Sequence, residues 1–180
     1  MKLKKTQIIG FIFTVIVGTV LHFTYEWSGE NAFVGTFSPV NESVWEHLKL
    51  LYVPMIIFGI IEVFLYGRKK ANFIPIRSLS ILLGMLFIVA AFYIYSGIIG
   101  RNYFVVDILI YIAAVYASYF FSKRLLKTEK FTSPASKILA ILGIILLIAL
   151  TIEFTFAPPH IELFRDPNTG TFGALLSTNG

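Results

Sequence analysis

Residues 2–25 read KLKKTQIIGFIFTVIVGTVLHFTY, and this stretch decides the class of fold. Three lysines come first, and an apolar block then runs from Gln7 to Tyr25. A helix needs about 20 apolar residues to cross the hydrocarbon core of a bilayer, so this block is long enough to span. A secretory signal peptide also begins with basic residues, but the small-x-small cleavage site that ends one is not evident here. We therefore expect a retained transmembrane helix.

Four more apolar segments follow the first. The chain has 180 residues, of which 57% are hydrophobic and 14% charged, and a soluble domain of this length would carry more charge. We expect helices at about 7–25, 42–66, 76–99, 104–122 and 138–157, with Pro54 kinking the second. The sequence thus predicts an all-α polytopic bundle of about five transmembrane helices. It forms a single membrane domain, residues 1–180, that ends in a tail at 158–180.

The basic residues indicate the orientation of the bundle. Twelve of the 15 Lys and Arg residues lie near the N-terminus, at 68–77 or at 123–137. Because cytoplasmic loops carry the excess of Lys and Arg, we expect the N-terminus inside and the C-terminus outside a cell membrane. This placement accounts for the net charge of +5 without nucleic acid as a partner. The expected partners are the lipid bilayer and, at the outer face, a lipid or another membrane protein.

Ionisable side chains gather at the outer ends of the predicted helices. All three histidines lie there, as do eight of the ten acidic residues: Glu26, Glu30, Glu42, Glu46, Asp107, Glu153, Glu162 and Asp166. Charged groups in or against apolar helix ends are costly unless they are paired or face a polar cavity. On the inner side, Glu62 is expected to snorkel to the membrane surface or to pair with Arg68.

The spacing of the outer groups favours a metal site. His22 and Glu26 are four residues apart and share a face of the first helix, while Glu46 and His47 stand near the start of the second. A short loop makes these helices antiparallel neighbours, so the groups should lie at similar depth. Imidazoles and carboxylates are ligands for zinc or a similar divalent metal. The candidate metal ligands are His22, His47 and His160. The candidate catalytic residues are Glu26 and Glu46, which would complete the ligand shell or act as a general base.

The same groups also fit a structural role. The chain has no His-Glu-x-x-His motif, and Lys49 and Arg101 are available as counter-charges for a closed network of ion pairs. An enzyme needs an open metal position and a cavity that reaches the lipid or the outside. A structural network pairs every member and leaves no cavity. The geometry of the site therefore separates the two interpretations.

The tail contains strong turn-forming residues. Residues 166–170 read DPNTG, in which Asp bonds the backbone and Pro sets the next dihedral angle. The apolar residues Ile161, Leu163 and Phe164 precede this turn. We expect the tail to fold as an ordered cap on the membrane surface or over the outer groups.

Three stretches carry a resemblance to a known group of proteins. They read HFTYEW at 22–27, NESVWEHLK at 41–49, and PPH with DPNTG at 158–170. Together they resemble an uncharacterised family of small bacterial multi-pass membrane proteins, a domain of unknown function, over the whole chain. The resemblance implies a bacterial membrane location and transfers no catalytic residues.

Two classes of function remain open at this point. One is an ion-binding or partner-binding accessory protein, or a purely structural network, without an enzymatic activity. The alternative is a metal-dependent membrane hydrolase or transferase that acts on a lipid-type substrate at the outer leaflet. A transporter is disfavoured, because the middles of the predicted helices lack ionisable residues and the chain has no internal repeat.

Overall fold

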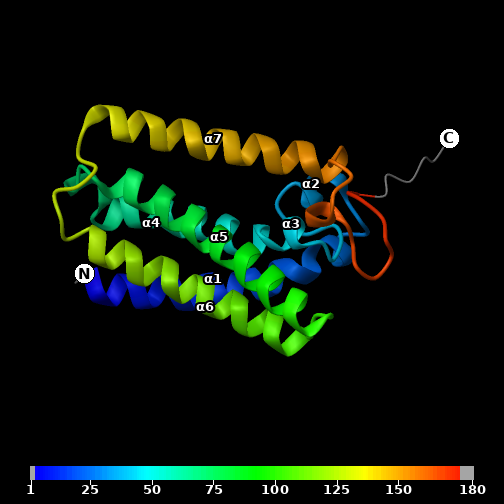
Figure 1. Cartoon of the computed structure of the whole chain (residues 1–180). Helices are drawn as coiled ribbons and strands as arrows, with labels where there is room; N and C mark the ends of the chain where they lie inside the picture. The colour runs from blue at the N-terminus through cyan, green and yellow to red at the C-terminus, as the bar shows by residue number, and fades with distance from the viewer. Residues whose placement is uncertain (1–2, 175–180) are drawn as a thin grey trace.

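A computed structural model describes residues 3–174, and every long element within them is a helix (Figure 1). The long helices are α1 (Leu3–Trp27), α4 (Lys49–Leu65), α5 (Phe73–Ile99), α6 (Phe104–Leu125) and α7 (Pro134–Phe156). The short elements are α2 (Ala32–Gly35), α3 (Val44–His47) and the 3-10 turns η1 (Gly67–Lys69) and η2 (Glu162–Phe164). Helix α3 leads directly into α4, so the described chain has five helical segments long and apolar enough to cross a membrane. The prediction of an all-α bundle with about five such helices is confirmed.

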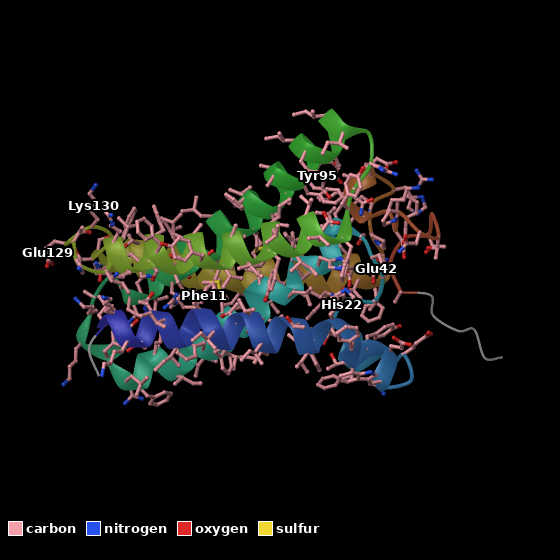
Figure 2. The ribbon with its side chains drawn as sticks, turned by 90° about the horizontal axis from the view of Figure 1, so that it is seen from below. Phe11, His22, Glu42, Tyr95, Glu129 and Lys130 are labelled. Carbon is pink, nitrogen blue, oxygen red and sulfur yellow. The ribbon has the colours of Figure 1, made fainter. Side chains whose placement is uncertain are left out.

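The long helices run side by side and define two ends of the molecule (Figure 1). The start of α1 and the connections 66–72 and 126–133 lie at one end, which we call the basic end. Helices α2 and α3, the turn η2 and the tail lie at the other, which we call the histidine end. Figure 2 shows the separation, with His22 and Glu42 at one end and Glu129 and Lys130 at the other.

Helix α4 lies at the centre of the bundle. Of its apolar span 56% is buried, whereas the other four spans bury only 17–22%. Leu51 and Met55 of α4 are fully buried, together with Ile81 of α5 and Val115 of α6. The outer helices expose large apolar side chains that suit contact with lipid, among them Ile16, Leu86, Leu139 and Leu146.

The second span begins later than the predicted residue 42. Ser43 is the N-cap of α3, and its hydroxyl accepts the backbone N–H of Glu46 at 3.3 Å. A serine that caps the first turn in this way favours a helix start at the next residue. As a result Glu42 stands before the helix, where its direction is not tied to the helical repeat.

Pro54 interrupts the hydrogen bonds of α4, and a neighbouring helix compensates. Proline has no N–H, so the carbonyl oxygen of Leu50 lacks its usual donor. The hydroxyl of Tyr111 in α6 lies 3.2 Å from this oxygen and 2.8 Å from the carbonyl oxygen of Thr14 in α1. Gly18 of α1 makes room for the contact, because a Cβ atom there would clash with both Tyr111 and the Leu50 carbonyl. Three helices are thereby joined one turn from His22.

A buried ion pair connects the helices near the basic end. Arg77 of α5 donates to Glu62 of α4, which also accepts a hydrogen bond of 2.7 Å from Gln7 of α1. The prediction that Glu62 snorkels to the membrane surface or pairs with Arg68 is wrong, since Glu62 is fully buried and pairs with Arg77. The Arg68 guanidinium lies 4.4 Å from the centre of the Phe64 ring. Helix α5 begins at Phe73, three residues earlier than predicted, and Arg77 in its first turns lies against α4.

Candidate metal centre

Three side chains from two separate segments meet at the histidine end. His22 comes from α1, His47 ends α3, and Glu42 lies just before α3. The Nε2 atoms of the two histidines are 3.2 Å apart. The Glu42 Oε2 atom is 3.4 Å from Nε2 of His47 and 3.8 Å from Nε2 of His22. The structure thus brings together the two histidines that sequence spacing indicated and adds a carboxylate to them. Figure 2 shows His22 and Glu42 near each other at this end of the bundle.

These separations match the spacing of ligands around one metal ion. Zinc binds imidazole nitrogen and carboxylate oxygen at about 2.0–2.2 Å, so two ligands of a tetrahedral site lie roughly 3.4 Å apart. The three measured separations lie between 3.2 and 3.8 Å. Two histidines and a glutamate also form the ligand set of several catalytic zinc sites, which keep their fourth position for water or substrate. The group therefore has the ligand types and spacing for a divalent metal.

The backbone orients His47 toward the group. Its Nδ1–H donates to the carbonyl oxygen of Ser43 at 2.9 Å. A carbonyl oxygen only accepts, so in the neutral ring the proton is on Nδ1 and the Nε2 lone pair faces His22 and Glu42. Metal-ligating histidines commonly make this kind of hydrogen bond with their second nitrogen, because it fixes the tautomer and the ring orientation.

The tail holds the backbone of Glu42 in place. The N–H of Glu42 donates to Asp166 Oδ2 at 3.3 Å, and the other carboxylate oxygen of Asp166 caps the turn predicted at 166–170. Beside this contact, the side-chain amide of Asn41 donates to the carbonyl oxygen of Gly173 at 3.2 Å. When the His47 ring is protonated, its hydrogen bond and positive charge lower the pKa of the Glu42 carboxyl below its usual value, so this carboxylate keeps a negative charge that can bind a cation.

A partly open cavity of about 510 Å³ lies next to the three side chains, and all three line it. The rest of its wall comes mostly from α1, α5 and α6, with Pro167 and Asn168 from the tail. Its apolar lining includes Val15, Leu50, Ile88, Phe92, Phe104 and Ile108. Val15 precedes His22 by two helical turns, so the cavity extends about 10 Å from the histidines along the bundle. Its polar lining includes Asp107, which accepts hydrogen bonds from Tyr95 and Asn102.

The other candidate residues lie elsewhere. Glu26 is exposed in the last turn of α1, and Glu46 is buried. The ring of the exposed His160 stacks on Phe172, with 4.6 Å between ring centres. Within residues 3–174, the group that is spaced for a metal contains none of these three side chains. The geometry therefore gives no support to a ligand role for His160 or a catalytic role for Glu26 and Glu46, and these roles stay predictions.

Glu46 belongs to a closed network that is separate from the histidines. Lys49 Nζ donates to Glu46 Oε2 at 2.6 Å and to the Thr155 hydroxyl of α7, also at 2.6 Å. The carbonyl oxygens of Gly35 and Ser38 lie 2.7 and 3.2 Å from the same nitrogen. Both members of the ion pair are almost fully buried. The histidine end thus contains two arrangements: a saturated network around Lys49, and a group at a cavity wall around His22.

Glu42 is the residue of the site that spacing alone did not single out. The signal for it is Ser43. Because Ser43 is an N-cap, the helix begins at the next residue, and Glu42 lies before the helix and outside its repeat. A carboxylate in the loop that precedes a helix can turn back toward the preceding helix, and here that helix carries His22.

Comparison with known proteins yields a family and no activity. No curated protein and no solved structure matches the chain. A family model of unknown function matches residues 1–174, which is nearly the whole chain and agrees with the resemblance noted in the sequence. The chain belongs to the DUF6512 family, a family of unknown function.

Proposed function

We propose that the protein is a membrane-embedded, divalent-metal-dependent hydrolase whose metal is held by His22, Glu42 and His47. The observation that carries the proposal is the spacing of three ligand atoms by 3.2–3.8 Å at the wall of a cavity. A purely structural network would leave no cavity beside its members, whereas this group lines one. The saturated network around Lys49 shows what that alternative looks like in the same molecule.

The metal would supply the chemistry of hydrolysis. With three protein ligands, a tetrahedral ion would keep one position for water or substrate, and the cavity lies beside the three ligands. A bound divalent ion polarises a carbonyl group and lowers the pKa of its water to about 7. In ester or amide hydrolysis, the water oxygen bonds to the carbonyl carbon and the bond to the leaving oxygen or nitrogen breaks. The leaving group takes one proton from the water, and the acid product keeps the water oxygen.

The basic residues support the placement of this site at the outer face of a cell membrane. Lys and Arg concentrate at the opposite end of the bundle, around the start of α1 and the connections 66–72 and 126–133. By the positive-inside rule, the basic end and the N-terminus lie in the cytoplasm, and the histidine end lies outside. The metal group then stands at the level of the outer leaflet, where a lipid-type substrate reaches the cavity from the bilayer. The resemblance to bacterial proteins supports a bacterial cell membrane.

A second candidate is metal binding without catalysis. The two carboxylates expected to act as a base, Glu26 and Glu46, are outside the cavity lining, and Glu46 is engaged with Lys49. This observation favours an accessory protein that uses the metal to bind a partner at the outer face. Both candidate functions require the bound metal, and only the hydrolase turns over a substrate.

Metal analysis of the purified protein tests the shared claim. We expect near-stoichiometric zinc or another divalent metal in the wild type, and its loss in the variants His22→Ala, Glu42→Ala and His47→Ala. The matched control is His160→Ala, which removes a histidine outside the group and should keep the metal. A wild-type protein that is folded and free of metal after exposure to zinc overturns the proposal. Hydrolysis of long-chain esters that requires the metal then separates the enzyme from the accessory protein.

A further inference from the structure

The charges around the cavity indicate which lipids it accepts. We infer that the cavity binds a lipid with a long hydrocarbon chain and an uncharged, hydroxyl-bearing head, joined by an ester or amide bond. The inference rests on the proposed hydrolase function and names its substrate class.

The lining of the cavity suits a hydrocarbon chain. Its walls carry aliphatic and aromatic side chains from α1, α5 and α6, and they lie within segments apolar enough to cross a membrane. Ligand cavities in proteins commonly measure roughly 300–1,000 Å³, and this one, at about 510 Å³, falls in that range. A chain that follows the wall from Val15 toward His22 ends beside the three metal-ligand atoms. The head of the lipid then lies at the histidine end.

The described lining of the cavity offers no Lys or Arg side chain to an anionic head, and its two histidines are assigned to the metal. Among the described residues that line it there is neither Lys nor Arg, the residues that bind phosphate groups. The basic residues at the histidine end contact other groups: Lys49 pairs with Glu46, Arg101 donates to the Tyr103 hydroxyl, and Arg165 pairs with Glu162. None of these three side chains is part of the cavity lining.

Two carboxylates of the lining oppose an anionic head directly. Glu42 and Asp107 contribute two negative charges, which a divalent ion balances. The loaded site is then neutral overall, so a further negative charge from a phosphate would be uncompensated in an apolar setting. A neutral carbonyl meets no such penalty, and the metal polarises it.

Polar groups of the lining fit hydroxyls on the head. The carboxylate of Asp107 accepts from Asn102, and the side chain of Asn168 in the tail lines the same cavity. Carboxylate and amide oxygens accept hydrogen bonds from hydroxyl groups, and amide nitrogens donate to them. Monoacylglycerols combine such hydroxyls with a long chain and an ester bond, so they represent the class.

A comparison of two lipids with the same chain tests the inference. Native mass spectrometry of the metal-loaded protein, released from non-ionic detergent, measures binding of monooleoylglycerol and of 1-oleoyl lysophosphatidic acid. We expect the neutral lipid to bind at least about tenfold more tightly. In Asp107→Asn, which removes one negative charge, the difference in affinity between the two lipids should become smaller. Equal or tighter binding of the anionic lipid, or no binding of the neutral one, overturns the inference.

Two further variants show whether binding occurs in the cavity. Ile108→Trp fills part of it and should abolish lipid retention while the metal stays bound. Ile145→Trp on the exposed face of α7 is the control and should change neither lipid retention nor metal binding. Retention of the neutral lipid in Ile108→Trp contradicts the assignment to the cavity. Metal content is measured on the same samples, so a wild type that binds the lipid but no metal refutes the hydrolase and leaves the lipid assignment standing.

Discussion

The Nε2 atoms of His22 and His47 lie 3.2 Å apart, although 25 residues separate the two histidines in the chain. Two neutral imidazoles at this distance share at most one hydrogen bond, and two protonated imidazoles repel each other. A divalent cation between them removes both difficulties, because it accepts a lone pair from each ring. We therefore infer that these atoms, together with Glu42 Oε2, hold a metal.

Metal removal should lower the thermal stability of the wild type. A ligand that binds only the folded state stabilises it by about 2.7 kcal/mol at a concentration 100 times its dissociation constant. We expect a chelator to lower Tm in detergent, and added zinc to restore it. In His22→Ala neither addition should move Tm. A wild-type Tm that changes with neither the chelator nor zinc would contradict a metal site at His22, Glu42 and His47.

Asp166 should control metal affinity without touching the metal. It accepts the N–H of Glu42 and caps the turn at 166–170, so it positions the Glu42 carboxylate. Loss of such a supporting residue typically lowers metal affinity about 10- to 100-fold. We expect Asp166→Ala to weaken zinc binding by this amount in a competition titration against a chelating dye. The control is Glu162→Ala, which removes an exposed acidic side chain from the same tail. Unchanged zinc affinity in Asp166→Ala would argue against the role of Asp166 in positioning Glu42.

Removal of Lys49 alone should destabilise the protein strongly. Its loss leaves Glu46 buried without a counter-charge, and breaking a buried pair from one side costs about 3–5 kcal/mol. Lys49→Met should therefore lower Tm far more than the double variant Glu46→Gln with Lys49→Met, which buries no charge. Metal content per folded protein should stay near the wild-type value in the double variant, because the network is separate from the histidines. Equal losses of Tm in the single and double variants would refute the ion-pair argument.

Gly18 should tolerate no side chain. A Cβ atom there would clash with the Tyr111 hydroxyl and the Leu50 carbonyl, where α1, α4 and α6 meet. We expect Gly18→Ala to lower Tm clearly, even though alanine favours helices by about 1 kcal/mol over glycine. Gly143→Ala in α7 is the matched control, since a Cβ atom there meets no neighbour within 4 Å. That variant should be neutral or stabilising, and a Gly18→Ala protein as stable as Gly143→Ala would exclude the close contact.

The class of fold was predictable because bilayer thickness acts on each segment separately. Hydropathy alone locates five spans, and each predicted range overlaps a helix of the structure. The boundaries shifted where local chemistry took over. Ser43 delayed the start of the second span, and α5 began early at Phe73. Glu62 pairs with Arg77 rather than with Arg68 because α4 packs against α5, and this contact is not contained in the local sequence.

The site was predictable only in part, because side-chain direction depends on tertiary packing. The short loop between the first two spans was enough to predict that His22 and His47 approach each other. It could not show that Glu46 turns inward, since that direction depends on Lys49 and on Thr155 of the distant α7. Nor does any periodicity continue past Pro158 to place His160. The missing knowledge in each case is a contact between segments far apart in the chain.

X-ray absorption spectroscopy of the zinc-loaded protein reports the ligands of the metal itself. We expect a first shell of nitrogen and oxygen at about 2.0–2.2 Å, with the outer-shell signature of two imidazole rings. His47→Ala should lose one imidazole from that signature or lose the zinc altogether, and His160→Ala should reproduce the wild-type spectrum. Zinc bound in the wild type without imidazole ligands, or an unchanged spectrum in His47→Ala, would contradict a metal centre at His22, Glu42 and His47.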